Sequence, residues 1–240
     1  MRRIKKAVSF LSGTPFHPQW LIRHDKQRFL RDIGATLTGR VVDIGCADRS
    51  SRRYLDDKAD YIGLDYYTAI SLYGTTPDIF GDAGSLPFSD GCVDAVLLLD
   101  VLEHVQEPQK CLDEIHRVLV AGGKLVLAVP FMYPIHDAPH DYQRWTEFGI
   151  RSLLQSRGFS IREEQAHGQA LVSACVLANL ALCKTVVDSL QRRHPAGLLF
   201  VFLPVLIPLF NLLGLLSRVL LPKDDFMPYR YHVTAVRDLR

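Results

Sequence analysis

Cysteine is scarce in this sequence, and its spacing argues against two common uses of the residue. Five cysteines stand at positions 46, 92, 111, 175 and 183, an odd number with no C-x-x-C pair among them. This spacing disfavours both a disulfide framework and a cysteine zinc site. We therefore expect a protein of the reducing cytoplasm with no bound metal.

A large excess of charge is also lacking. The formal net charge is only +2 over 240 residues, without the dominant basic field typical of nucleic-acid-binding proteins, so we expect no nucleic-acid partner. Positive charge gathers instead in residues 1–40, where nine Lys/Arg stand against two Asp/Glu. The apolar stretch after the first basic residues is interrupted at Ser12 and Pro15, which makes it too short for a signal peptide.

Short apolar runs alternate with helix-sized intervals through the middle of the chain. An amphipathic helix over 18–37, with Phe29 and Leu37 on its apolar face, precedes them. We expect strands at 41–44, 61–64, 78–80, 93–99, 124–129, 159–163 and 229–236. The run 93–99 is apolar at every position but Asp94, as in a central strand covered on both faces, so the pattern predicts a parallel α/β sheet.

Two helices between these strands have recognisable ends. Pro108 suits the first turn of a helix that we expect to bury Leu119 and to end at Gly122-Gly123. Thr146 suits the N-cap of a second helix, whose buried face should include Phe148.

Long apolar runs are confined to the region before the last expected strand. Residues 171–183 carry no charge, 184–194 form a polar link, and 196–217 are 22 residues without an ionisable side chain. That length suffices for a bilayer. Strands on either side of the region place both its ends on one side of any membrane, which excludes a single crossing. We expect shallow insertion at the cytoplasmic face, aided by the basic N-terminal region, with a homodimer interface or a lid as the alternative.

A tight turn of small residues follows the first expected strand, in the segment V-V-D-I-G-C-A-D at 41–48. Asp65 stands twenty residues after Gly45, at the end of the second expected strand, where an acid can accept hydrogen bonds from a ribose. A dinucleotide-binding dehydrogenase shares both features. It fits less well, because its G-x-G-x-x-G/A pattern falls here on Gly45, Ala47 and Ser50.

Several further motifs resemble the class I S-adenosylmethionine-dependent methyltransferases. They are D-A-G-S-L-P-F-S-D-G-C-V-D-A-V from residue 82, D-V-L-E-H-V from residue 100, and E-I-H-R-V-L from residue 114. The resemblance spans about residues 40–165. It implies a Rossmann-like, doubly wound seven-stranded sheet, with the apolar helical insertion placed before the last strand.

The resemblance also implies which residues bind S-adenosylmethionine. Asp43 and Gly45 match the loop that holds its methionine part, Asp65 its ribose, Asp82 and Ala83 its adenine edge, and Asp100 the pocket beside the reacting methyl. The family usually has glycine where this chain has Ala47, and commonly where it has Arg49. The turn is therefore expected to avoid positive φ, at some cost to cofactor binding.

The acceptor site is expected in the segment 130–146, which resembles a P-H-D-Y-x-R-W-T stretch of methyltransferases of glycan and lipid-linked sugar pathways. The residues singled out are His136 and His140 as proton acceptors, Asp141 as the acid that orients them, and Tyr142, Arg144 and Trp145 as acceptor-binding residues. Arg144 suits an anionic group of the acceptor. The alternative is that Tyr142 and Trp145 pack in the core while Arg144 pairs with a nearby acid. His104 and His116 are expected to be structural.

These observations predict four regions and one function. The regions are a basic segment with an amphipathic helix (1–39), a cofactor-binding core (40–165), an apolar helical insertion (166–226) and a final strand (227–240). The predicted function is methyl transfer to a hydroxyl or similar group of a small or lipid-linked acceptor, by a peripheral or monotopic protein at the inner membrane face. The alternative is a catalytically degenerate binding or scaffold protein with the same fold.

Overall fold

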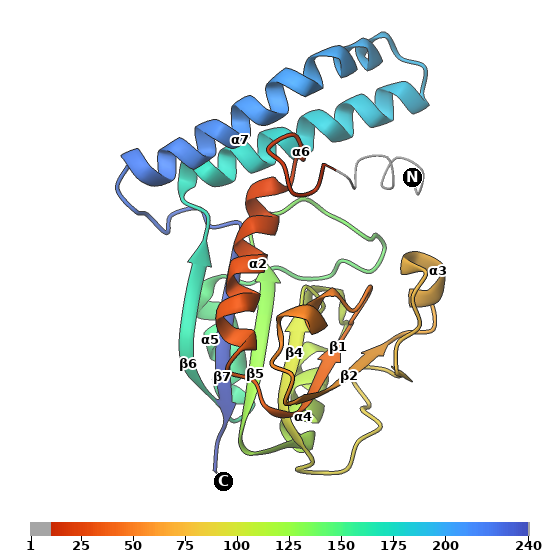
Figure 1. Cartoon of the computed structure of the whole chain (residues 1–240), viewed down its shortest axis with the longest axis vertical. Coiled ribbons are helices and arrows are strands. Elements are labelled where there is room, and N and C mark those ends of the chain that lie inside the picture. Colours follow the sequence, from red (N-terminus) through yellow and green to blue (C-terminus); the bar gives the residue numbers. More distant parts are fainter. Residues whose placement is uncertain (1–10, 240) are drawn as a thin grey trace. The chain divides into compact units, whose positions relative to one another are not determined.

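The computed structural model describes residues 11–239, and these fall into two compact units (Figure 1). One unit holds residues 29–166 and 230–239 and contains the sheet. The other holds residues 11–28 and 167–229 and contains the long apolar helices. Helix α2 (Trp20–Gly34) contributes residues to both.

The sheet has seven strands in the order β3-β2-β1-β4-β5-β7-β6. Their bounds are β1 Gly39–Ile44, β2 Ala59–Asp65, β3 Ile79–Phe80, β4 Val93–Leu99, β5 Leu119–Pro130, β6 Phe159–His167 and β7 Arg230–Arg237. The pairs from β3 to β5 are parallel, and β7 runs antiparallel to β5. This confirms the predicted fold class and the positions of all seven strands.

The centre of the sheet is dry because its strands are apolar on both faces. In β4 only Asp94 is exposed, and β1 and β5 flank it in register, with Val41 opposite Ala95 and Leu125 opposite Val96. The expected apolar face of α2 is also buried, since Phe29 packs against this layer. The strand ends that carry polar residues therefore meet at one edge of a rigid sheet.

The helices of this unit are α3 (Ala69–Tyr73), α4 (Pro108–Val118), α5 (Glu147–Ser156) and the short 3₁₀ helices η1 (Ser50–Tyr54) and η2 (Leu102–His104). Two expectations were wrong. Helix α4 ends at Val118, and Leu119 opens β5, where it pairs with Val93 just before a register shift. Gly122-Gly123 thus lies inside a strand. Thr146 does cap α5 by accepting from the Gly149 N–H, but Phe148 is 73% exposed.

The second unit is built on two long helices that run side by side, α6 (Ala170–Gln191) and α7 (Leu203–Leu220), joined by the 3₁₀ helix η3 (Pro195–Phe202) (Figure 1). The expected polar link from residue 184 proved wrong, since α6 continues through Lys184 and Asp188, which form an exposed i,i+4 ion pair. Buried Asn179 donates to Asn211. Asn211 in turn donates to the carbonyl of His17, so polar contacts fix the register of the helices.

The insertion leaves and rejoins the chain at adjacent backbone positions. Its first and last neighbours are His167 and Tyr229, and the Tyr229 N–H donates to the His167 carbonyl at 2.9 Å. Asp25 is buried beside them and binds Arg218 through both carboxylate oxygens. The two ends therefore lie together, as the exclusion of a single membrane crossing required.

Candidate functional site

A cavity of about 780 Å³ opens at the carboxyl ends of β1, β2 and β4. This is the edge of an open parallel sheet at which ligands bind. Its walls include five of the six expected cofactor residues, namely Gly45, Asp65, Asp82, Ala83 and Asp100. From the acceptor segment, His140 and Tyr142 also line it.

The turn after β1 depends on residues in the left-handed backbone region. Gly45 has φ +70°, and a Cβ built on it would overlap Val101 Cγ2. The expectation that the turn avoids positive φ after Gly45 was wrong, because Ala47 has φ 48° and Arg49 has φ 59°. Arg49 is held there by an ion pair to Asp78 at 2.6 Å. The turn therefore adopts the left-handed backbone conformation typical of glycine at two positions that are not glycine. Each of them lowers the stability of the fold by about 1–2 kcal/mol.

Asp65 connects this turn to the end of β2. One carboxylate oxygen accepts from the Ala47 N–H and the other from the Tyr66 N–H, each at 2.8 Å. A carboxylate accepts about four hydrogen bonds, so lone pairs remain for a ligand in the cavity. Asp82, in the loop after β3, accepts from the Gly84 N–H at 2.7 Å. Burial and then the charge of Asp82 raise the pKa of Tyr66.

Asp43 has a different place from the one expected. It is buried beneath the turn, at 3% exposure, and one of its carboxylate oxygens accepts from both the Ser51 and the Tyr61 hydroxyls. Burial and the Asp43 charge raise the pKa of Tyr61, which keeps that hydroxyl a donor. Asp43 therefore ties η1 and β2 together beneath the cavity wall, and its role toward the cofactor stays a prediction.

The E-I-H-R motif on α4 fixes the loop that carries Asp82. Arg117 donates to the carbonyls of Leu86 and Phe88 and forms an ion pair with Glu114 at 2.7 Å. Glu114 also accepts from the Leu86 N–H. The motif thus positions a wall of the cavity from outside it.

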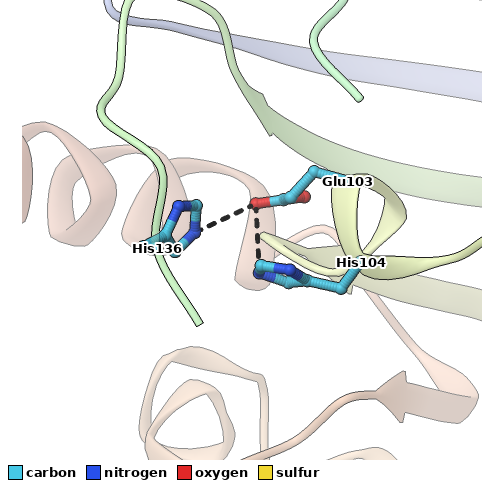
Figure 2. Close-up of side chains that lie close together, drawn as sticks. All are labelled: Glu103, His104 and His136. Carbon is cyan, nitrogen blue, oxygen red and sulfur yellow. Dashed lines mark ion pairs between the residues drawn. The ribbon is translucent and has the colours of Figure 1, made fainter. Parts of the chain in front are cut away.

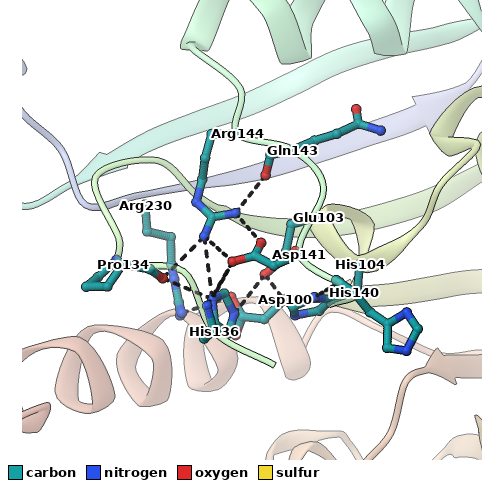
Figure 3. A network of polar contacts seen from close by, with 10 residues as sticks. All are labelled: Asp100, Glu103, His104, Pro134, His136, His140, Asp141, Gln143, Arg144 and Arg230. Atoms are coloured by element: carbon teal, nitrogen blue, oxygen red, sulfur yellow. Dashed lines mark hydrogen bonds and ion pairs between the residues drawn. The ribbon is translucent and has the colours of Figure 1, made fainter. Parts of the chain in front are cut away.

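The acceptor segment after β5 is held together by a buried acid (Figure 3). Asp141 has a side chain only 1% exposed and binds Arg144 through both oxygens, at 2.5 and 2.8 Å. It also accepts from the backbone N–H of His136 and lies 3.3 Å from that residue's Nδ1. Hydrogen bonds from Arg144, more than any other cause, hold the pKa of Asp141 well below its usual range. Asp141 therefore remains a carboxylate and orients His136.

Two expected acceptor-binding residues have structural contacts instead. Arg144 is committed to Asp141 and to the Gln143 carbonyl, and Trp145 packs against the main apolar core. Tyr142 stays at the cavity, where its hydroxyl lies 3.0 Å from His140 Nδ1 and accepts from Gln106. Arg144 and Trp145 thus have the contacts that the alternative described, and their role toward an acceptor stays a prediction.

Comparison with known proteins agrees with this geometry. A family model described as a methyltransferase domain matches residues 42–127, the stretch that supplies β1 to β5 and most of the cavity wall. Residues 42–127 of the chain therefore form a methyltransferase domain, in agreement with the class I S-adenosylmethionine-dependent family that the motifs indicated. This confirms the resemblance drawn from the motifs.

Curated relatives of this chain match over only part of their own length. A demethylmenaquinone methyltransferase of Renibacterium salmoninarum is 40% identical over 50% of this chain and 52% of its own. One from Paenarthrobacter aurescens is 35% identical over 48% and 46%. The chain spans about half the length of these relatives, so their activity does not carry over without further argument.

Solved structures show the same fold at low identity. A Bacillus halodurans protein described as a methyltransferase superposes with a TM-score of 0.54 at 16% identity, covering 89% of this chain and 99% of its own. The cyclase SpnF gives a TM-score of 0.59 at 19% identity, covering 92% and 83%. Because a cyclase shares the fold, the fold alone does not decide the reaction.

Sequence reasoning missed one group beside the cavity. Glu103 lies in η2 with no exposed surface, and burial together with the Asp100 charge raises its pKa to about 8. His104, expected to be structural, lines the cavity beside it. His116 does pack structurally, edge-on against Phe159. The neighbouring Glu103 and His104 of the D-V-L-E-H-V motif could have indicated this group. Their importance depends, however, on His136, which is distant in the sequence.

Proposed function

We propose that this chain binds S-adenosylmethionine in the cavity and transfers its methyl group to a hydroxyl or similar group of a small or lipid-linked acceptor at the cytoplasmic membrane face. The observation that supports the proposal is that Asp65 and Asp82 line the same cavity. Asp65 lies at the end of β2, and Asp82 lies in the loop after β3. The turn at Gly45 also has no room for a side chain, because a Cβ built there would overlap Val101, which lines the same cavity.

When bound, S-adenosylmethionine supplies an electrophilic methyl group on a sulfonium. The accepting atom, a hydroxyl oxygen or a ring carbon of a quinol, forms the new bond to carbon as the carbon–sulfur bond breaks, and the acceptor loses the proton that this atom or its hydroxyl carried. His140 is the group at the cavity wall that is suited to take this proton at neutral pH. His136, the other histidine expected in this role, is engaged by Asp141 behind the wall. The protein's remaining task is to align the reactants and exclude water.

The acceptor is proposed to be a lipid of the quinone type. Two relatives are named for methylation of demethylmenaquinone. The second unit of this chain also has an exposed apolar surface, which suits a substrate that resides in a membrane. Within Pro195–Leu220, an 18-residue window has a mean hydropathy of 2.5, and only 17% of that window is buried. The core helix of a soluble protein is mostly buried, so this helix resembles a membrane-associating one more closely.

The apolar helices are proposed to lie in the membrane interface rather than to cross it. Two of the described helices are long and apolar enough to span a bilayer, including the 22-residue α6, which is longer than its uncharged run suggested. A crossing hairpin would carry Arg192 and Arg193 to the far side, against the positive-inside tendency. Pro208 lies within α7 and favours a bent, shallow helix.

Cofactor binding is tested by calorimetry with the Asp65→Ala variant. Loss of hydrogen bonds from a charged acceptor costs about 1.5–3 kcal/mol each, so two ribose hydroxyls predict at least about a 100-fold weaker affinity for S-adenosylmethionine. Asp60→Ala is the matched control, because Asp60 is an exposed acid on the same strand. Equal affinity of the Asp65→Ala variant and the wild type would place the cofactor elsewhere.

A second candidate is the binding or scaffold protein that has lost catalysis. The observation that favours it is the strained turn, in which Ala47 and Arg49 adopt positive φ. A folded wild-type protein that binds no S-adenosylmethionine at millimolar concentration would establish this candidate and remove the enzyme.

Membrane association is tested by flotation with anionic liposomes. Val205 and Leu216 on α7 are 64% and 54% exposed, so replacing both with serine should weaken flotation at least about tenfold. Phe148→Ser is the control, since that exposed aromatic belongs to the other unit. Wild-type protein that stays in the soluble fraction as a dimer would favour a protein interface instead.

A further inference from the structure

Three side chains converge on one point beside the cavity (Figure 2). Glu103 is fully buried, and its Oε1 lies 3.8 Å from His104 Nε2 and 3.8 Å from His136 Nε2. The candidate ligand atoms all lie within 4.8 Å of one another. Within residues 11–239, neither carboxylate oxygen of Glu103 has a hydrogen-bond partner. A buried carboxylate without partners is costly, so the site calls for a ligand.

The outer nitrogens of both histidines are already occupied by acceptors. His104 Nδ1 lies 2.6 Å from the His140 carbonyl, and a carbonyl can only accept, so Nδ1 carries the proton. His136 Nδ1 lies 3.2 Å from the Pro134 carbonyl and 3.3 Å from Asp141, both acceptors, and farther, at 3.5 Å, from the Arg144 guanidinium, a donor. The two shorter contacts favour a proton on Nδ1. In the neutral rings, each Nε2 therefore presents a lone pair.

When Glu103 is ionised, this leaves two nitrogen lone pairs facing a carboxylate, an arrangement that a cation bound between them would stabilise. Arg144 and Arg230 already act on Glu103 electrostatically, but neither forms a hydrogen bond with its carboxylate. Metal-binding histidines commonly have this support, with the outer N–H donated to a carbonyl or carboxylate. Donors bound to one ion at about 2.0–2.2 Å lie roughly 3.0–3.6 Å apart. The two 3.8 Å separations from Glu103 thus need to shorten by a few tenths of an ångström, and the two imidazole nitrogens, which lie within 4.8 Å of each other, must close to the same range.

We propose that Glu103, His104 and His136 bind one divalent transition-metal ion, of the class that includes Zn²⁺, Fe²⁺ and Co²⁺. Two histidines and one carboxylate suit these ions better than Mg²⁺ or Ca²⁺, which prefer all-oxygen sites. Three protein ligands leave coordination positions open, as in catalytic rather than structural sites. His104 lines the cavity, so the open positions are available to water or to an oxygen atom of a bound molecule.

The test measures metal binding by the full chain without S-adenosylmethionine, so that its outcome is independent of the proposed methyl transfer. Protein stripped with a chelator and dialysed is titrated with Co²⁺ and Zn²⁺, and bound metal is counted by mass spectrometry. We expect one equivalent per chain, and visible cobalt absorption without a thiolate band, which excludes the cysteines as ligands. His136→Ala and Glu103→Gln should each weaken binding at least about 100-fold.

His116→Ala is the matched control, because that histidine packs against Phe159 away from the cluster, and it should bind like the wild type. Thermal unfolding with and without Zn²⁺ separates lost ligands from lost folding. The wild type should be stabilised by the metal, whereas folded His136→Ala should not. His136→Gln, which keeps more of the side-chain volume, replaces it if the alanine variant does not fold. No binding by the wild type at millimolar Zn²⁺, or unchanged binding in folded variants, would overturn the proposal.

Discussion

Replacing Gly45 with alanine tests whether the turn after β1 is built around a missing side chain. At φ +70° an alanine costs about 1–2 kcal/mol relative to an unstrained backbone. The new Cβ also overlaps Val101 Cγ2, and relieving such a clash costs about 1–3 kcal/mol. We therefore expect Gly45→Ala to lower the free energy of unfolding by about 2–5 kcal/mol, a large fraction of a typical domain's stability.

A double-mutant cycle separates the two contributions. Val101→Ala removes the methyl group that the new Cβ meets. The double variant should therefore regain the stability lost to the clash, about 1–3 kcal/mol, while the loss from backbone strain remains. Urea unfolding of the wild type, both single variants and the double variant gives the coupling energy directly. Calorimetry with S-adenosylmethionine on the double variant then asks whether the added Cβ also blocks the ligand.

Two results would refute this reasoning. A loss below about 0.5 kcal/mol in Gly45→Ala would mean that the turn does not need a left-handed residue there. A coupling energy of zero with Val101→Ala would mean that the side chain of Val101 is not what excludes the Cβ.

Three further predictions concern the turn after β1, the histidine at position 17, and Arg117, which fixes the loop that carries Asp82. Ala47→Gly should raise the free energy of unfolding by about 0.5–1 kcal/mol, because it relieves positive φ, and a shift in the urea midpoint measures it. Burial lowers the pKa of His17 to about 4. The unfolded chain therefore takes up this proton first as the pH falls, so stability should drop between pH 6.5 and 4. His17→Asn, which keeps an acceptor for the Gln19 N–H, should flatten that part of the pH profile. Arg117→Ala should speed amide exchange in residues 84–91 and weaken cofactor binding about tenfold. An unchanged exchange rate would contradict the conclusion that Arg117 fixes this loop.

The strands were predictable because burial on both faces demands continuous apolar runs, and β4 is one. Errors arose where tertiary contacts outweigh local preference. Gly122-Gly123 suggests a helix end, yet pairing with β4 and β7 makes this segment part of β5. The charges at Lys184 and Asp188 suggested a link, yet they lie one helical turn apart and pair on the exposed side of α6.

The candidate site was predictable to a different extent on its two sides. The cofactor side follows from strand ends and motif order, so Asp65 and Asp82 could be assigned from sequence. On the acceptor side, composition identified the segment but not the contacts within it. The motif P-H-D-Y-x-R-W-T does not indicate that Asp141 and Arg144 form an ion pair with each other. Glu103 was missed because its importance depends on two imidazoles that only the fold brings to it.

The insertion between β6 and β7 has a consequence for engineering. Because the His167 carbonyl and the Tyr229 N–H are already hydrogen-bonded, a short turn would reconnect the two strands once the intervening hairpin is excised. The excision would also remove the partners of two buried residues near α2, because Arg218 pairs with Asp25 and Asn211 donates to the His17 carbonyl. A shortened protein therefore needs a replacement for Asp25 that requires no cation.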